Sequence, residues 1–159
     1  MSKPVPAHGH VTHAKDHPVQ NHCFACGRDN SDGLQLEFFF ELEAHRAFCN
    51  FKLPLKYQGP PGHAHGGIIA TILDEAMGKV NKLRNVLALT KSMNVEYLKP
   101  VPLETPLTVN AGEKQVVGRE HTNFAEIVDG QGKVLARSTG VFVVVDLRKK
   151  FAQQLGISD

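Results

Sequence analysis

Residues 64–78 read AHGGIIATILDEAMG, and this stretch decides the fold that the sequence predicts. Apolar side chains recur in it and just after it at intervals of three and four residues, which is the spacing of one helix face. These residues are Ile69, Ile72, Leu73, Ala76 and Val80. The pattern predicts one long helix over residues 68–80. The two glycines before it lack a Cβ, so their amides can approach another group closely.

A second stripe lies beside the apolar face at helical spacing, and its members are small apart from one acid. They are Gly67, Ala70, Thr71, Asp74 and Gly78. A carboxylate next to an apolar face is costly to bury without a partner or a purpose. Asp74 can therefore face water, as we expect for its neighbours Glu75 and Lys79, or it can belong to a functional site. The small residues around Asp74 favour the site.

The composition is that of one soluble globular domain. The chain has 159 residues, of which 42% are hydrophobic and 21% are charged, and this length is sufficient for a proper core. The net charge is only +2, and no basic cluster exceeds residues 148–150, so we expect no nucleic-acid partner. No apolar run approaches the roughly 20 residues that span a bilayer, so we expect no membrane partner.

The cysteines and the N-terminus bear on cellular location. The chain has three cysteines, an odd number that does not make a disulfide framework, and its first residues contain no apolar signal core. We therefore expect a reducing, cytoplasmic location.

The two ends of the chain differ from the part between them. Residues 1–21 are rich in histidine and proline with little apolar surface to bury, which predicts a flexible arm that binds metal only adventitiously. Residues 22–146 have the pattern of the folded domain, and residues 147–159 form a short tail that we expect on the surface.

Cys23 and Cys26 form a Cys-x-x-Cys pair, which we compare with three kinds of site. A structural zinc site needs about four ligands, and no second cysteine pair follows. A redox dithiol calls for a strand before it and a helix after it, whereas turn residues follow over 28–33. Haem attachment needs a histidine after the second cysteine, where this chain has Gly27. We therefore favour a packed structural turn, and we expect no metal site and no cofactor.

The remaining periodic segments have the composition and alternation of strands. Two precede the helix, at residues 34–43 and 47–53, and four follow it, at residues 86–98, 107–117, 121–128 and 134–145. The last segment contains VFVVV at 141–145, which is apolar on both faces and so predicts a central strand. One helix between two strands and four strands predicts an α+β fold, with the helix against an antiparallel sheet.

Several motifs occur in a fixed order along the chain. His65-Gly66-Gly67 is followed by Asp74, nine positions after the histidine. Residues 23–34 (CFACGRDNSDGL) and 58–62 (QGPPG) precede this motif, and residues 94–100 (NVEYLKP) follow it. Together they resemble the hotdog-fold acyl-CoA thioesterases, especially the phenylacetate-degradation type and the mitochondrial thioesterase-superfamily members. The resemblance extends over about residues 20–146.

The resemblance implies the hotdog fold, in which an antiparallel sheet wraps around one long central helix. It also implies a homodimer, or a homotetramer built as a dimer of dimers, with active sites at the dimer interface. The substrate would be acyl-CoA. Asp74 would be the general base, or alternatively the nucleophile, in hydrolysis of the thioester.

The other catalytic residues that the resemblance implies are Gly67, His65 and Thr90. The Gly67 amide would polarise the thioester carbonyl, a role that also suits the unpaired N–H groups and partial positive charge of a helix start. His65 would hold the loop or the thioester end, and Thr90 matches a catalytic-site threonine of the mitochondrial branch. By strand alternation we expect Thr90 to share a face with Ser92 and Asn94, as a polar row that orients water.

The substrate-binding residues expected from the same resemblance are Gly66, Gln58, Asn94, Tyr97 and Lys99. Lys99 stands at a strand end, from which its side chain would reach a phosphate of coenzyme A. The chain departs from many relatives at Gly59, where they have Asn or Gln, and at Gly78, where others have a hydroxyl residue.

Two alternatives to hydrolysis remain open. One is a non-catalytic acyl-CoA-binding protein on the same fold, and the other is a hotdog hydratase or dehydratase. Asp74 favours hydrolysis over pure binding, because a binding protein needs no carboxylate beside the thioester. The hydratases pair a histidine with an acid in a different motif.

Overall fold

The computed structural model describes residues 11–13 and 20–146 of the 159. The elements in chain order are β1 (Val11–His13), β2 (Phe39–Glu41), β3 (Arg46–Phe51), a 3-10 turn η1 (Leu55–Tyr57), α1 (Gly66–Lys82), β4 (Ala88–Tyr97), β5 (Leu107–Val117), β6 (Glu120–Val128) and β7 (Val134–Val144).

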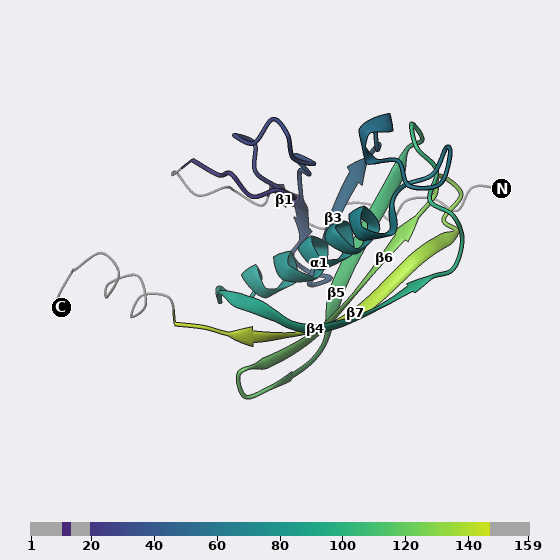
Figure 1. The fold of residues 1–159 in the computed structure, drawn as a ribbon. Coiled ribbons are helices and arrows are strands. Elements are labelled where there is room, and N and C mark those ends of the chain that lie inside the picture. Colours follow the sequence, from purple (N-terminus) through teal and green to yellow (C-terminus); the bar gives the residue numbers. More distant parts are fainter. Residues whose placement is uncertain (1–10, 14–19, 147–159) are drawn as a thin grey trace.

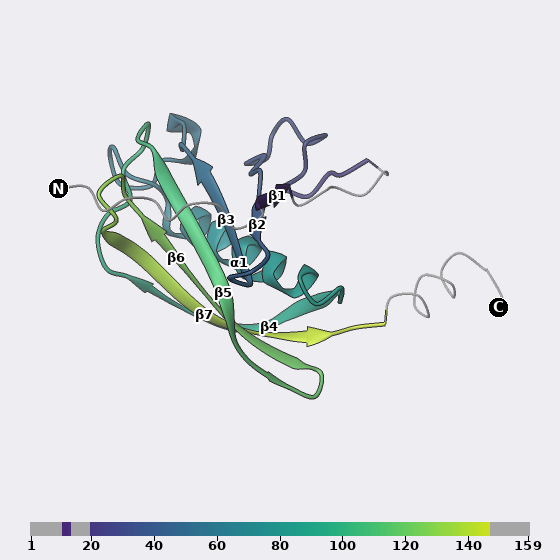
Figure 2. The same ribbon diagram turned by 180° about the vertical axis from the view of Figure 1, so that it is seen from behind.

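The strands form one antiparallel sheet in the order β1-β2-β3-β5-β6-β7-β4. The sheet curves around α1, which lies across its concave face and contacts β3 to β7 (Figure 1). No helix of the described part of the chain covers the opposite face (Figure 2). The predicted α+β fold, with one long helix against an antiparallel sheet, is therefore confirmed. β7 lies between β6 and β4, so its apolar run belongs to an internal strand.

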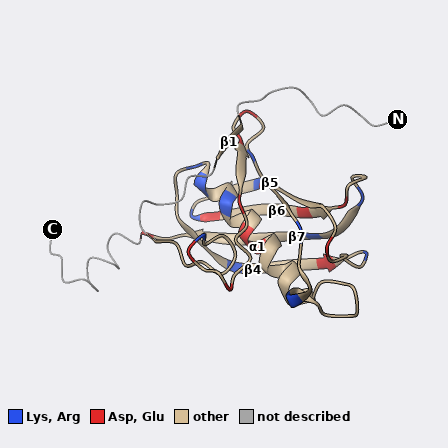
Figure 3. Ribbon diagram, turned by 90° about the horizontal axis from the view of Figure 1, so that it is seen from above, with Lys and Arg blue, Asp and Glu red and all other residues tan. Residues whose placement is uncertain are grey.

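The predicted apolar face of α1 is the face that packs on the sheet. All five of its predicted residues are buried, and Met77 joins them. Replacing a fully buried leucine such as Leu73 by alanine typically lowers the free energy of unfolding by about 2–5 kcal/mol. The buried apolar face therefore holds the helix on the sheet. The helix carries its acidic residues near its middle and its lysines in the last turn, where they complement the helix dipole (Figure 3).

The prediction that Lys79 faces water is wrong, and Glu75 is only partly exposed. Lys79 is only 3% exposed, and its Nζ lies 3.3 Å from Oε1 of Glu75. The reason is a long-range contact, because the segment before β2 packs over this side of α1. It brings Cys26 to 3.2 Å from the Lys79 ammonium and the ring of Phe38 to 5.7 Å from it.

The first predicted strand is shorter than expected. Residues 34–38 do not pair with another strand of the sheet. Instead, Leu34 and Leu36 donate their backbone N–H groups to the carbonyls of Phe24 and Ala25, which lie in the turn at residues 23–27, the cysteine turn. Gln35 between them has a positive φ of 49°, which interrupts an extended strand.

One strand falls inside the predicted N-terminal arm. β1 pairs with β2, and the ring of His13 stands edge-on to Phe39 at 5.2 Å, with its Nε2 2.7 Å from Glu37. The rest of the arm up to residue 19 and the predicted tail after Asp146 lie outside the described residues. No helix in the described ranges is long and apolar enough to cross a membrane.

Candidate active site

Asp74 and Thr90 form the polar centre of the candidate site. Asp74 lies midway along α1 and is half-buried, and the Thr90 hydroxyl on β4 donates a 2.7 Å hydrogen bond to its Oδ1. Burial raises the pKa of the Asp74 carboxyl above its ordinary value, the Thr90 hydrogen bond opposes this rise, and the nearby charge of Glu75 adds to it. A half-buried carboxylate with a raised pKa and a fixed orientation is suited to accept a proton.

A β-bulge directs Thr90 toward the helix. Thr90 pairs with Phe142 and Ser92 with Val141, which leaves Lys91 as an extra residue in β4. An extra residue reverses the alternation of side chains beyond it. Met93 and Val95 therefore pack against the core, and Ser92 and Asn94 take the other face. The predicted polar row of Thr90, Ser92 and Asn94 on one face is wrong for this reason.

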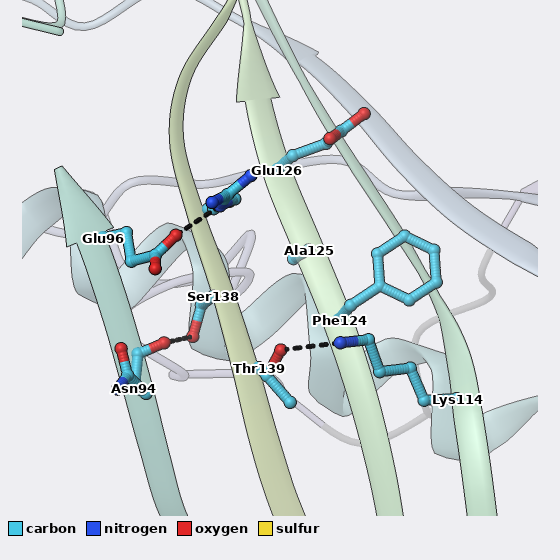
Figure 4. Close-up of a pocket in the computed structure, with 9 residues that line it drawn as sticks. Asn94, Glu96, Lys114, Phe124, Ala125, Glu126, Ser138 and Thr139 are labelled. Carbon is cyan, nitrogen blue, oxygen red and sulfur yellow. Dashed lines mark hydrogen bonds and ion pairs between the residues drawn. The ribbon is translucent and has the colours of Figure 1, made fainter. Parts of the chain in front are cut away.

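Asn94 lies on the outer face of the sheet, away from Asp74. There it lines a cavity of 460 Å³ with Lys114, Thr139 and the ion pair between Arg137 and Glu96 (Figure 4). The structure thus separates Asn94 from the other predicted site residues. The alternation of residues in the sequence did not indicate this separation, because the bulge has no recognisable sequence pattern in this strand.

His65 caps the start of α1 and engages the predicted carbonyl-polarising group. Its Nδ1 accepts a 2.9 Å hydrogen bond from the Gly67 N–H, and its own carbonyl accepts bonds from Ile68 and Ile69. A Cβ on Gly67 would stand 3.2 Å from the same Nδ1, so the imidazole leaves little room for a side chain there. A thioester oxygen reaches the Gly67 amide only if it replaces the imidazole.

Tyr97 joins β4 to the helix start. Its hydroxyl donates a 2.9 Å hydrogen bond to the Gly66 carbonyl, and its ring lies 3.6 Å from where a Gly66 Cβ would be. Tyr97 also lines a cavity of 390 Å³ whose walls include the apolar side chains of Ile69 and Val101. Lys99 stands among the lining residues and is exposed, so its ammonium can reach a ligand that leaves this cavity.

Gln58 supports the loop in front of the helix. Its Oε1 accepts a 2.9 Å hydrogen bond from the Gly62 N–H, and its backbone pairs with Ala64. Gly62 has a positive φ of 78°, a conformation that glycine adopts without strain. Gln58 thus holds the turn that leads the chain into His65.

Asp74 and Gly67 are too far apart to act on one carbonyl within a single chain. They are seven residues apart on one face of α1, which corresponds to about 10 Å at about 1.5 Å per residue. A thioester carbonyl whose oxygen lies about 3 Å from the Gly67 amide would place its attacking water too far from Asp74, because the two residues are about 10 Å apart along the helix. A single chain therefore does not bring these two predicted groups to one carbonyl.

Residues 61–136 match the thioesterase superfamily. The acyl-coenzyme A thioesterase THEM4 of Rattus norvegicus is 32% identical over 122 residues, which cover 75% of this chain and 53% of that protein. The chain thus spans about half the length of the curated relatives it matches.

The fold is similar to two solved structures. A thioesterase superfamily protein superposes with a TM-score of 0.74 at 30% identity, over 77% of this chain and 60% of that one. The PaaI protein from the phenylacetic acid degradation operon of E. coli superposes with a TM-score of 0.65 at 18% identity, over 71% of this chain and 81% of that one, which bears on the fold alone. With the His-Gly-Gly motif at the start of α1 and the sheet wrapped around it, these matches show that the chain has the hotdog fold and that its residues 61–136 are similar to the thioesterase superfamily.

Proposed function

We propose that this protein hydrolyses acyl-CoA thioesters to a free acid and coenzyme A. The observation that carries the proposal is the half-buried Asp74 carboxylate, oriented by Thr90, on the same helix face as the Gly67 amide. The name of the rat relative, an acyl-coenzyme A thioesterase, supports the acyl-CoA substrate.

Asp74 acts as the general base in the proposed reaction. A water molecule attacks the thioester carbonyl carbon and gives a proton to the carboxylate, the C–S bond breaks, and coenzyme A leaves as a thiolate that takes up a proton. A positioned base typically contributes 10²–10⁴-fold to the rate. The Thr90 hydrogen bond keeps one carboxylate oxygen fixed, so that the other can face the water.

The active unit in this proposal is a homodimer. Among the described strands β4 pairs with β7 alone, so its outer edge carries backbone groups suited to pairing with a second copy. The half-buried small-residue face of α1 that carries Asp74 gives a second surface for the partner. In the dimer, Asp74 of one chain would face the Gly67 amide of the other, which resolves the separation within one chain. A dimer of dimers and a cytoplasmic location stay predictions.

The cavity at Tyr97 is where we place the coenzyme A arm. It adjoins the helix start, so a thioester at Gly67 would continue past Tyr97 and reach Lys99 at the rim. Gly66 allows this approach because it has no side chain between the helix start and the tyrosine ring. Gln58 would act indirectly, through the turn that it holds.

The test is release of free thiol from a panel of acyl-CoAs, followed spectrophotometrically for wild type, Asp74→Asn and the control Glu126→Gln. Glu126 lines the cavity on the outer face of the sheet, so its substitution should leave turnover unchanged. Asp74→Asn should lower kcat by at least about 10²-fold. Acyl-CoA binding without thiol release by wild type would favour the binding-protein alternative, and addition of water to an enoyl-CoA would favour the hydratase.

A further inference from the structure

A cluster of reactive side chains lies on the side of α1 that faces the cysteine turn. The Cys23 thiol is 3.8 Å from Oε2 of Glu75, and Sγ of Cys26 accepts a hydrogen bond from the Lys79 ammonium at 3.2 Å. Lys79 also pairs with Glu75 at 3.3 Å. None of these four side chains takes part in a chemical step of the proposed hydrolysis, although the charge of Glu75 adds to the raised pKa of Asp74.

The two sulfur atoms are close enough to bond after small side-chain rotations. The sulfurs of Cys23 and Cys26 and a carboxylate oxygen of Glu75 all lie within 4.8 Å of one another. The cysteines are three residues apart in a tight turn, in which the Gly27 N–H donates to the Cys23 carbonyl at 2.8 Å. Residues three apart in a turn have Cα atoms within about 7 Å, so Cys23 and Cys26 lie close to the range that a disulfide spans.

Both thiols are reachable from solvent. Cys23 is exposed, and Cys26 lines a cavity of 290 Å³ together with Arg28, Phe38 and Lys79. The third cysteine, Cys49, is fully buried in the core and is not part of the cluster. The cavity gives a small-molecule oxidant access to the Cys26 side of the pair.

The surroundings distinguish the roles of the two thiols. Burial and the Glu75 carboxylate raise the pKa of Cys26 to about 12, so this thiol stays protonated at neutral pH. The exposed Cys23 is therefore the sulfur that an oxidant meets first. The Lys79 ammonium can stabilise a thiolate on Cys26 when a disulfide is reopened.

We propose that Cys23 and Cys26 are a redox-active dithiol that a small-molecule disulfide, such as glutathione disulfide, converts to an intrachain disulfide. The Cys23 thiolate attacks one sulfur of the oxidant and releases one thiolate, which leaves a mixed disulfide. Cys26 then loses its proton, attacks the Cys23 sulfur and releases the second thiolate. Two protein thiols are oxidised, the oxidant is reduced to two thiols, and the two protons end on the released thiolates. This reaction is independent of the proposed hydrolysis.

Three donor atoms this close together can also hold a metal ion. The Lys79 ammonium argues against this occupant, because it already places a positive charge 3.2 Å from Cys26 and 3.3 Å from Glu75. A divalent ion in the same place would stand against that buried charge. The cluster therefore favours the dithiol over the metal site.

The first experiment follows thiol oxidation in a Cys49→Ser background, which leaves only the pair. The protein is equilibrated with glutathione redox buffers and quenched with acid. Its free thiols are then alkylated, and the mass of the intact protein is measured by mass spectrometry. Oxidised protein should lose two hydrogen atoms and resist alkylation, and peptide mapping should find Cys23 joined to Cys26. In Cys26→Ser, the mixed disulfide should accumulate on Cys23, whereas in Cys23→Ser most of Cys26 should stay free.

Three results would overturn the proposal. The first is that both thiols stay free in every buffer, including pure glutathione disulfide. The second is a stoichiometric metal ion that the purified protein retains against a chelator. The third is an oxidation product in which an oxygen atom links the Cys26 sulfur to the Lys79 nitrogen.

The second experiment tests Lys79 as a positioning residue. In Lys79→Met the reduced Cys26 loses a charged hydrogen-bond donor, so the dithiol–disulfide equilibrium should move toward the disulfide by roughly tenfold. Lys52→Met, which changes an exposed lysine in the loop after β3, is the control and should leave the equilibrium unchanged. If Lys79→Met does not fold, the double variant Glu75→Gln/Lys79→Met avoids the unpaired carboxylate and should move the equilibrium the same way. An unchanged equilibrium in a folded variant would remove Lys79 from the proposal.

Discussion

The Thr90 hydroxyl lies 2.7 Å from the Asp74 carboxylate, and it does so because Lys91 is an extra residue in β4. In a regular strand Thr90 would share a face with Ser92 and Asn94, which are on the outer side of the sheet. The bulge turns Thr90 toward α1 and keeps Met93 and Val95 in the core. One irregular position in β4 thus serves both the hydrophobic core and the candidate site.

Replacing Thr90 by alanine should change the pH dependence of hydrolysis. The Thr90 hydrogen bond lowers the pKa of Asp74, so its loss should raise that pKa further. A general base acts only when deprotonated, and the acid limb of kcat/KM should therefore move to higher pH. Turnover at neutral pH should fall by about tenfold, the scale of one hydrogen bond to a charged group.

Two further variants make this test specific to the hydroxyl. Thr90→Ser keeps the donor and should restore most of the wild-type profile. Ser92→Ala changes the neighbouring hydroxyl on the outer face and should leave the profile unchanged. An acid limb that stays in place in Thr90→Ala would show that Asp74 is not the titrating base.

Asp74→Asn should lose activity without losing stability at neutral pH. Because burial raises the folded-state pKa of Asp74, wild type loses stability as pH rises from the ordinary aspartate pKa of 3.8 through that raised value. Asparagine carries no charge to desolvate, and its carbonyl can still accept the Thr90 hydrogen bond. Thermal unfolding at a fixed protein concentration should give Asp74→Asn a Tm at or above that of wild type at pH 7, with the difference shrinking below pH 4. A lower Tm for the variant at pH 7 would contradict the raised pKa.

Two inactive variants should restore activity when mixed. Gly67→Val places a side chain against the His65 imidazole, only 3.2 Å from the Cβ position, and should block the amide. If Asp74 and Gly67 act across the dimer interface, a heterodimer of Gly67→Val and Asp74→Asn has one site with both native groups and one with neither. Mixing with subunit exchange should therefore recover up to about a quarter of wild-type activity, since half of the dimers are then mixed. Mixtures that exchange subunits and stay inactive would place the site within one chain.

Lys99→Ala should weaken the binding of coenzyme A and leave the chemistry alone. Lys99 is exposed at the rim of the Tyr97 cavity, so a phosphate contact there is worth about 1 kcal/mol and its loss should raise KM several-fold. The contact is equal in ground and transition states, so kcat should hardly change. The effect should shrink as salt rises. A thioester analogue without the nucleotide is the control, and equal harm to that substrate would mean that Lys99 acts on structure.

Much of the fold follows from local sequence patterns. The spacing of Ile69, Ile72 and Leu73 is enough to place α1 and its buried face, because a helical period survives any tertiary arrangement. The limits of β5 are those predicted from the sequence, and α1, β4, β6 and β7 differ from their predicted limits by one or two residues. The Asp74–Thr90 pair follows from the family resemblance, which carries over the spacing of the two residues.

The features that sequence reasoning missed depend on contacts between distant residues. The sequence pattern predicts that Lys79 is exposed to solvent. In the structure it is buried, because Cys26 and Phe38, about 50 and 40 residues earlier in the chain, pack over it. Regular strand alternation predicts that Asn94 and Thr90 lie on the same face of β4, and the bulge at Lys91 places them on opposite faces. β1 is too short for a pattern, and it forms because β2 offers an edge to pair with.

In the proposed reaction, the hydrogen bond between His65 and Gly67 would make the free protein compete with its own substrate. A helix cap of this kind is typically worth about 1 kcal/mol. If the substrate binds only to the uncapped population, its apparent dissociation constant is about fivefold weaker than the intrinsic one. In that reaction the same imidazole would return to the amide once the carboxylic acid departs, so it would also oppose inhibition by the product. A variant with a poorer cap at position 65 would gain affinity for substrate and product together, and the cap thereby limits how tightly either one is held.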